Sequence, residues 1–115
     1  MNKRIAVIAG PTASGKTELS LTLAERFGGE IVSADSMQIY RGMDIGTAKP
    51  APAERRGIPH HMLDVAEPGD DWSVSRYEKE AARCVEDILR RGKLPILCGG
   101  TGLYINAVLT GSGFQ

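Results

Sequence analysis

The chain has 115 residues, a length typical of one domain with a single hydrophobic core. Apolar residues make up 42% and charged residues 24%, which argues against a disordered or a membrane-embedded chain. Fourteen basic and fourteen acidic side chains balance to zero net charge, so the surface as a whole does not indicate nucleic-acid binding, and any such partner must be held locally. We predict one domain, residues 1–115, in the cytosol and without membrane contact, because the apolar run at residues 5–9 is too short for a signal peptide.

The first quarter of the chain combines two hydrophobic patterns. Residues 4–9 contain a short apolar run typical of a strand that is buried on both faces of a parallel sheet. From Lys16 onward apolar residues recur at helical intervals until Gly28 and Gly29 interrupt them. The segment therefore predicts a strand, a loop and a helix. The apolar helix positions are Leu19, Leu23, Ala24 and Phe27.

The middle of the chain is less regular. Residues 31–34 predict a second strand that ends at Asp35, and the proline- and glycine-containing residues 36–71 predict mostly irregular structure. Within that stretch, residues 61–65 fit a brief strand and residues 54–56 a helical turn. A long irregular region in a compact domain is more often functional than idle.

The last third returns to regular patterns. Helical signals start at Ser73, where Ser75 and Glu78 have the spacing of a capping box. A third apolar strand follows over residues 94–98, and a further helix over residues 103–109. This order predicts an α/β fold, with a parallel sheet between helices. The expected apolar stripe of the helix that starts at Ser73 comprises Tyr77, Ala81, Val85, Ile88 and Leu89.

Between the first strand and the first helix lies the pattern Gly-x-x-x-x-Gly-Lys-Thr, over residues 10–17. Such a loop places backbone N–H groups around an anion at a helix N-terminus, where the helix dipole also favours negative charge. The Lys16 ammonium adds a cation, and the Thr17 hydroxyl can ligate Mg²⁺ that bridges phosphate oxygens. We therefore predict a P-loop that holds a di- or triphosphate. Its phosphate-binding residues are Gly10, Pro11, Thr12, Ala13, Ser14, Gly15, Lys16 and Thr17.

Two residues at strand ends are candidates for the reaction itself. Asp35 follows the second strand, and the carboxyl ends of parallel strands converge beside the phosphate loop. Its carboxylate could accept a proton or hold a magnesium-bound water, although in isolation an aspartate that starts a turn is the better interpretation. The Thr101 hydroxyl, after the third strand, could bond a leaving-group oxygen or equally cap the next helix. The loop alone does not choose between phosphoryl transfer and chemistry at carbon.

Several further polar residues favour structural roles. His60 and His61 could bind a metal or move protons, but no third ligand stands at a recognisable spacing. Cys84 and Cys98 belong to no CxxC pair, and we expect them to act as small hydrophobes. A solvated surface position is expected for the scattered cations. These are Arg41, Lys49, Arg55, Arg56 and Lys93.

Four short segments carry a family resemblance: residues 10–17, residues 33–40 continuing through 42–50, residues 59–64, and residues 99–104. Taken together, in this order and spacing, they resemble the tRNA dimethylallyltransferases, also called tRNA isopentenyltransferases or the IPP transferase family. The segments cover nearly the whole chain. The resemblance implies a P-loop NTPase-like sheet between helices.

The resemblance also implies a reaction, the transfer of a dimethylallyl group from its diphosphate to N6 of an adenine beside the anticodon of a tRNA. In that interpretation Asp35 is the general base and Thr101 lies near the transferred group and the leaving oxygen. The loop, with Lys16, Thr17 and the cofactor Mg²⁺, holds the departing diphosphate. A flipped adenine is expected in the cleft, since a stacked base cannot enter it. The residues implied in tRNA binding are Asp35, Ser36, Met37, Gln38 and Thr101.

Members of that family are considerably longer than 115 residues and act as monomers in this interpretation. We therefore expect residues 1–115 to be the N-terminal portion of such an enzyme and an incomplete domain. Three alternatives remain open at this point. The chain could belong to a small-molecule kinase, to a prenyltransferase that uses a free adenine nucleotide, or to an inactive phosphate-binding module.

Overall fold

A computed structural model describes residues 5–9, 16–35, 39–41, 52–63, 65–67, 69–70, 72–100 and 102–111. Strands and helices alternate along most of this part of the chain, as the sequence predicts. The elements are β1 (Ala6–Ala9), α1 (Lys16–Phe27), β2 (Gly29–Ser33), the 3₁₀ helix η2 (Pro52–Arg55), β3 (His60–His61), α2 (Val74–Arg90), β4 (Leu94–Gly99) and α3 (Gly102–Gly111).

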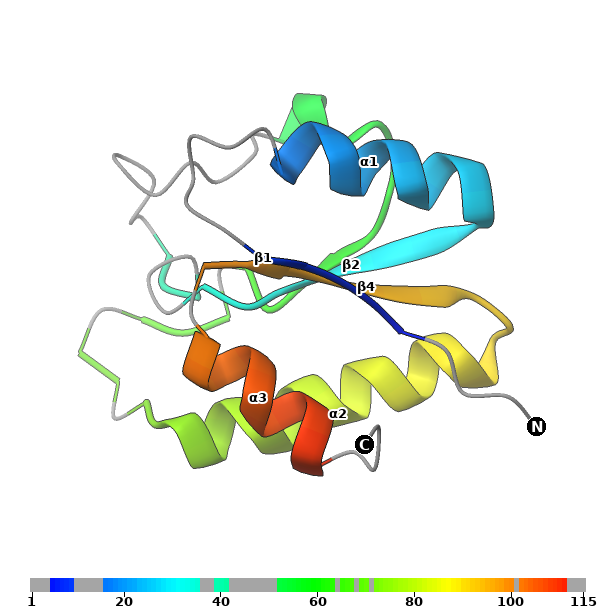
Figure 1. Cartoon of the computed structure of the whole chain (residues 1–115). Helices are drawn as coiled ribbons and strands as arrows, with labels where there is room; N and C mark the ends of the chain where they lie inside the picture. The colour runs from blue at the N-terminus through cyan, green and yellow to red at the C-terminus, as the bar shows by residue number, and fades with distance from the viewer. Residues whose placement is uncertain are drawn as a thin grey trace.

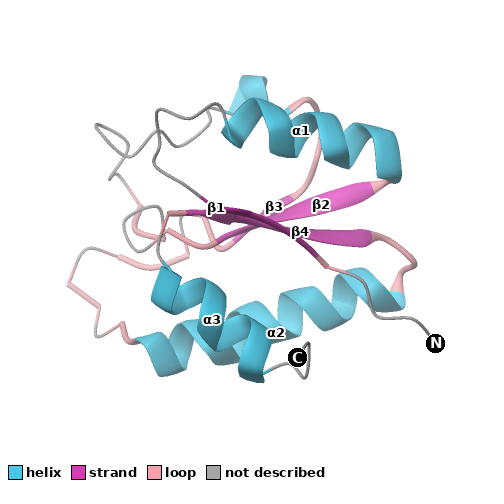
Figure 2. Cartoon of the chain, in the orientation of Figure 1, coloured by secondary structure: helices cyan, strands magenta, loops and turns pink. Residues whose placement is uncertain are grey.

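The described strands form one parallel sheet in the order β1-β4-β2-β3. Helix α1 covers one face of this sheet, and α2 and α3 cover the other (Figure 1). Seen along its edge, the sheet is a single layer between the two helical layers (Figure 2). The predicted α/β fold with a parallel sheet between helices is therefore confirmed. Among the described residues, no helix has both the length and the apolar character that a membrane crossing requires.

The hydrophobic core lies on both faces of the sheet, which explains why the strands read as continuous apolar runs. Alternate residues point to opposite sides: Ile31 and Ile96 join a small cluster with Ala24 of α1, while Val32 and Leu97 join the larger cluster under α2 and α3. Burying each such side chain stabilises the fold by about 1.5–3 kcal/mol. In the predicted stripe of α2 four side chains are fully buried, and Leu89 packs against the cluster as partly buried. The four are Tyr77, Ala81, Val85 and Ile88.

The buried side of α1 differs from the expected stripe. Ala24 is buried as expected, but Leu19 is 51% exposed and Phe27 is 61% exposed, while Leu21 is only 2% exposed. The predicted residues do share one side of the helix, at spacings of three and four residues, but the side that faces the sheet is rotated from that stripe toward Leu21 and Ala24. Gly28 ends the helix with a φ of +66°, a conformation that favours glycine, as the sequence predicts.

The N-cap of α2 differs from the one that the capping-box spacing predicts. Ser73 is the N-cap, with extended backbone angles, and its Oγ accepts a hydrogen bond from the backbone N–H of Arg76 at 3.1 Å. The Ser75–Glu78 spacing is not the cap, because Ser75 already lies inside the helix, where its own N–H and C=O follow the helical path. Ser73 and Ser75 are both possible N-caps by residue type, and only the folded structure shows that Ser73 is the cap. The brief strand predicted over residues 61–65 is present only in part, because β3 comprises just His60–His61. The helical turn predicted over residues 54–56 begins two residues earlier, as η2.

The buried carboxylate of Glu30, near the amino end of β2, forms hydrogen bonds with residues of β3 and of the C-cap of α2. The side chain of Glu30 is 6% exposed, and both of its oxygens accept hydrogen bonds from the guanidinium of Arg91, with Nη2–Oε1 at 2.9 Å. His61 Nε2 of β3 lies 2.7 Å from Oε1 of the same carboxylate. Chiefly because of the bond to Arg91, the pKa of Glu30 is held at about 2, below its ordinary value of 4.5. Burial opposes this shift, and the Arg91 contact outweighs it.

The two histidines have structural partners, which agrees with the favoured interpretation. His61 contacts Glu30 as above, and His60 Nδ1 lies 2.7 Å from the carbonyl oxygen of Ile58. Burial lowers the pKa of His60. In the part of the chain that the structure describes, no group of three or more His, Cys, Asp or Glu side chains is arranged to hold a metal ion.

The pKa of Glu30 predicts how stability depends on pH. A carboxylate whose folded pKa lies below its unfolded pKa contributes stability above the unfolded value, and this contribution is lost as pH falls from about 4.5 toward about 2. We expect Glu30→Gln to lower the free energy of unfolding by roughly 2 kcal/mol at neutral pH, and we expect the difference from wild type to shrink in acid. Urea denaturation across this pH range measures both quantities.

The matched control for that experiment is Glu86→Gln, which removes an exposed carboxylate from α2. It should leave the free energy of unfolding nearly unchanged at every pH. A Glu30→Gln difference that is the same in acid as at neutral pH would contradict the assignment of the pH dependence to Glu30.

Candidate functional site

Three neighbouring strands end at the same level of the sheet. In the register of β1 and β4, Ala9 lies beside Gly99, and the backbone N–H of Ala34 donates to the carbonyl of Cys98 at 2.9 Å. The sheet order places β4 between β1 and β2. Since all three strands are parallel, the segments that follow them leave the sheet at one edge, which is where α/β proteins bind ligands. Those segments are the glycine-rich loop after Ala9, Gly100 and Thr101 after Gly99, and Asp35 after Ala34.

The level of these strand ends depends on a glycine. A Cβ atom built on Gly99 would lie 2.4 Å from both the carbonyl carbon and the carbonyl oxygen of Ala34. Real Cβ atoms do not approach backbone atoms this closely, so only glycine lets the end of β4 lie this near to Ala34. The predicted strand ends at residue 98, so the sequence pattern did not indicate this packing role of Gly99. The available signal was the glycine that directly follows the apolar run of the strand.

Aromatic side chains lie on the α2 and α3 side of this edge. The Tyr77 hydroxyl, fully buried, donates a hydrogen bond to the backbone carbonyl of Ser33 at 2.7 Å. The rings of Tyr77 and Tyr104 stack with centroids 4.1 Å apart and an interplanar angle of 18°. Burial raises the pKa of Tyr104, and the charges of Tyr40 and Asp35 add to this shift. The helical patterns of the sequence predict both tyrosines on helices, but they carry no signal that the two rings meet behind the strand ends.

The residues predicted for the site divide into two groups. Asp35 is described and half-buried, directly after Ala34, and Lys16 and Thr17 form the start of α1, directly after the loop. The strand and the helix predicted to flank the loop are both present, so its expected context is confirmed. The remaining predicted site residues lie outside the described part of the chain. These are Gly10, Pro11, Thr12, Ala13, Ser14, Gly15, Ser36, Met37, Gln38 and Thr101.

Residues 39–41, which follow Asp35 in the chain, form backbone hydrogen bonds with residues 65–66. The backbone N–H groups of Val65 and Ala66 donate to the carbonyl of Ile39 at 2.9 and 3.0 Å, and Arg41 N–H donates to the carbonyl of Ala66 at 2.8 Å. The Ile39 side chain is fully buried. One stretch that carries the resemblance, residues 33–40, is thus hydrogen-bonded at its end to residues 65–66, which directly follow another, residues 59–64. In residues 59–64, Met62 has a φ of +66° and turns the chain sharply at the end of β3.

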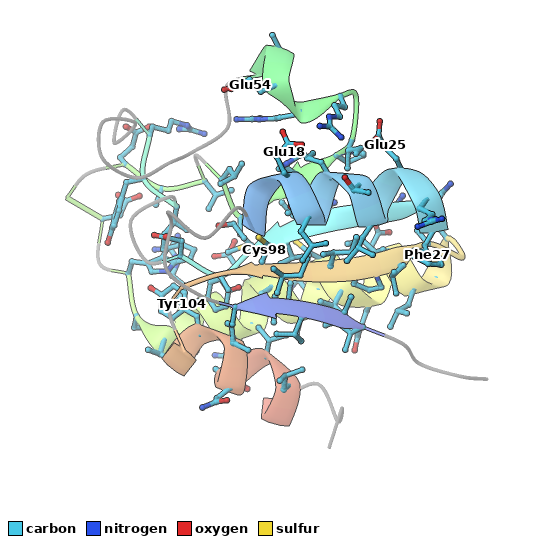
Figure 3. The ribbon with its side chains drawn as sticks, turned by 45° about the horizontal axis from the view of Figure 1, so that its top comes forward. Glu18, Glu25, Phe27, Glu54, Cys98 and Tyr104 are labelled. Atoms are coloured by element: carbon cyan, nitrogen blue, oxygen red, sulfur yellow. The ribbon has the colours of Figure 1, made fainter. Side chains whose placement is uncertain are left out.

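Two of the cations expected at solvated surface positions, Arg41 and Arg56, are exposed as predicted and also form ion pairs. Arg56 donates to Glu18 at 2.6 Å and to Glu25 at 2.9 Å, which joins the turn after η2 to the outer side of α1. Arg41 Nη1 lies 2.6 Å from Glu67 Oε1. Figure 3 shows Glu18 and Glu25 on the side of α1 that faces the segment with η2. The partners in these ion pairs are more than 25 residues apart in the sequence, so no local sequence pattern predicts them.

A parallel sheet whose first strand leads through a glycine-rich loop into the first helix, with Asp35 emerging two strands away, defines a P-loop NTPase-like α/β protein. Family comparisons narrow this class. The model described as "IPP transferase" matches residues 38–115, and the model described as "Isopentenyl transferase" matches residues 3–67. The chain belongs to the IPP transferase family.

Curated relatives agree with this assignment. The tRNA dimethylallyltransferase of Pelotomaculum thermopropionicum is 58% identical over 110 residues, which are 96% of this chain and 35% of the relative. The tRNA dimethylallyltransferase of Anaeromyxobacter sp. is 58% identical over 108 residues, 94% of this chain and 36% of that relative. The chain therefore spans about a third of the length of these relatives.

Solved structures show the same fold. The full-length tRNA isopentenylpyrophosphate transferase of Bacillus halodurans superposes with a TM-score of 0.91 and 49% identity, over 96% of this chain and 36% of that one. A eukaryotic dimethylallyltransferase, described as acting on tRNA, gives a TM-score of 0.88 and 43% identity, over 92% of this chain and 26% of that one.

The contact at Gly99 generates a prediction. We expect Gly99→Ala to destabilise the fold by about 1–3 kcal/mol or more, since the added methyl overlaps backbone atoms of Ala34 that cannot yield as a side-chain end would. The control is Gly102→Ala, at the start of α3, where an added Cβ meets nothing within 4 Å and φ is not positive. Thermal unfolding of both variants gives the comparison. Equal melting temperatures for the two variants would contradict a steric requirement at position 99.

Proposed function

We propose that residues 1–115 are the diphosphate-binding portion of a tRNA dimethylallyltransferase, which transfers a dimethylallyl group from its diphosphate to N6 of an adenine beside the anticodon. The observation that carries this proposal is the common level of the three strand ends, from which the glycine-rich loop, the Thr101 segment and Asp35 all emerge. The names of the relatives support the choice of reaction. The activity is proposed for a protein with the length of those relatives, acting as a monomer in the cytoplasm.

The loop side of the edge suits the leaving group. Lys16 and Thr17 begin α1, so a diphosphate held by the preceding loop would meet the positive end of the helix dipole together with the N–H groups that such a loop supplies. As the allylic carbon–oxygen bond breaks, negative charge grows on the diphosphate, and this cradle with the Lys16 ammonium would stabilise it. Mg²⁺ fits the hydroxyl donor that Thr17 supplies at the start of this helix, and when bound it would neutralise part of the diphosphate charge.

The opposite side of the edge suits the acceptor. Ala9 and Ala34 are separated by two strand spacings, about 10 Å, so the diphosphate and the base occupy different ends of the site. The adenine N6 forms a bond to the allylic carbon, the diphosphate leaves with the electrons of the carbon–oxygen bond, and the N6 proton passes to Asp35. Thr101 would bond the leaving oxygen. Ser36, Met37 and Gln38 would contact the flipped base, since an amide such as that of Gln38 matches an adenine edge.

A chimera tests this function. Residues 1–115 replace the corresponding N-terminal segment of the Pelotomaculum thermopropionicum relative, with which the chain shares 58% identity, and the product is incubated with Mg²⁺, dimethylallyl diphosphate and unmodified tRNA. We expect the tRNA to gain one dimethylallyl group on an anticodon-loop adenine, detected by mass spectrometry of its nucleosides. Parallel reactions with adenosine monophosphate, or with ATP and no prenyl donor, test for a free-nucleotide acceptor and for a kinase. Modification of the free nucleotide in preference to tRNA would overturn the proposal.

Two substitutions in the chimera separate the roles of the two sides. Asp35→Asn should lower the transfer rate by about 10²–10⁴-fold, because it removes the proton acceptor, and should leave dimethylallyl diphosphate affinity unchanged. Lys16→Ala should weaken that affinity by roughly 10- to 100-fold, the effect of losing one charged hydrogen bond. The matched control is Lys93→Ala, which removes an exposed lysine before β4 and should change neither the transfer rate nor the dimethylallyl diphosphate affinity. Equal loss of binding and rate in Asp35→Asn would contradict its role as a base.

A further inference from the structure

The end of β2 receives a hydrogen bond from outside the sheet. Tyr77 lies in the first turn of α2, its side chain is fully buried, and its hydroxyl donates to the carbonyl of Ser33 at 2.7 Å. Ser33 is the last residue of β2, two residues before Asp35. A bond from a helix thus fixes the backbone just before the residue proposed as the base.

The position of this bond follows from the strand pattern. The N–H of Ala34 points to β4, where it donates to Cys98, so the Ser33 carbonyl of the same trans peptide points to the other side. That is the side of β3, whose pairing with β2 stops at Val32 and His61. There the Tyr77 hydroxyl takes the position that a backbone donor of a longer strand would take.

The Tyr77 ring is itself held in place. It stacks on Tyr104, whose centroid is 4.1 Å away and which stands three residues after Thr101, near the start of α3 (Figure 3). The stack restricts the ring, and the ring directs the hydroxyl to Ser33. Tyr77 therefore contacts both elements that carry the proposed reacting residues, β2 before Asp35 and α3 after Thr101.

We propose that Tyr77 is a positioning residue for the transfer reaction, because its hydroxyl sets the direction in which the chain leaves β2 and so places the Asp35 carboxylate. This inference rests on the proposed function. Geometry of this kind matters to rate, since a misplacement of about 1 Å can cost about 10²-fold. Tyr77 itself stays buried and does not touch the substrate.

Tyr77→Phe in the chimera tests the proposal, because phenylalanine keeps the ring and its stack and deletes only the donor. We expect kcat for transfer to fall roughly 10- to 100-fold with the KM for dimethylallyl diphosphate unchanged. In an Asp35→Asn background the same substitution should cause no further fall, since the group that it positions is already gone. Independent, multiplied losses in the double variant would overturn the proposal.

Val85→Ala is the matched control for lost stability. Val85 lies on α2 in the same core cluster, is fully buried and is not in contact with the end of β2 through any hydrogen bond. It should lower the melting temperature as Tyr77→Phe does, with kcat of the folded enzyme unchanged. Equal kcat values for Tyr77→Phe and Val85→Ala would contradict the positioning role and leave Tyr77 with a role in core packing alone.

A second measurement separates this proposal from the proposed function. If the unsubstituted chimera transfers no prenyl group, the proposed function fails, and Tyr77 is judged by carbon-13 NMR of the Asp35 carboxyl in the 115-residue chain. Tyr77→Phe should shift that signal, whereas Val85→Ala should not. An unchanged Asp35 signal in Tyr77→Phe would overturn the positioning role.

Discussion

The close approach of β4 to the end of β2 is the constraint on which the functional edge depends. Gly99 lies so near the backbone of Ala34 that a methyl group would not fit, and Ala9 of β1 is paired with the same glycine. Because β4 lies between the other two strands, it sets the level at which both of them end. The end of β1 and Asp35 therefore lie at the same edge of the sheet, although 25 residues separate them in the sequence.

Helix α2 stabilises this arrangement by contacting β2 at both of its ends. At the amino end of the strand, Arg91 binds the buried carboxylate of Glu30. At the carboxyl end, Tyr77 binds the carbonyl of Ser33. The apolar stripe between these two contacts supplies most of the burial energy, but it would tolerate small sliding movements. Directional polar contacts at both ends fix the position of the strand along the helix, and with it the position of Asp35.

The fold could be predicted from sequence wherever a local apolar pattern decides the structure, as in β1, α2 and β4. The pattern could not decide which side of α1 faces the sheet, because Leu19 and Phe27 are spaced as regularly as the buried residues. It also could not choose Ser73 over Ser75 as the cap of α2. For the site, the strand and the helix that flank the loop followed from the motif, whereas the requirement for Gly99 comes from a contact between strands that are distant in sequence.

The exposed apolar side chains of α1 have a consequence for the chain in solution. Leu19 and Phe27 stand about two helical turns apart on α1, and Val7 of β1, the outermost described strand on its side of the sheet, is 41% exposed. Exposed hydrophobic patches and unpaired strand edges promote association between identical molecules. A solution of the 115-residue chain is therefore expected to remain monodisperse only when dilute, because these exposed apolar side chains add to the effect of its net charge of zero.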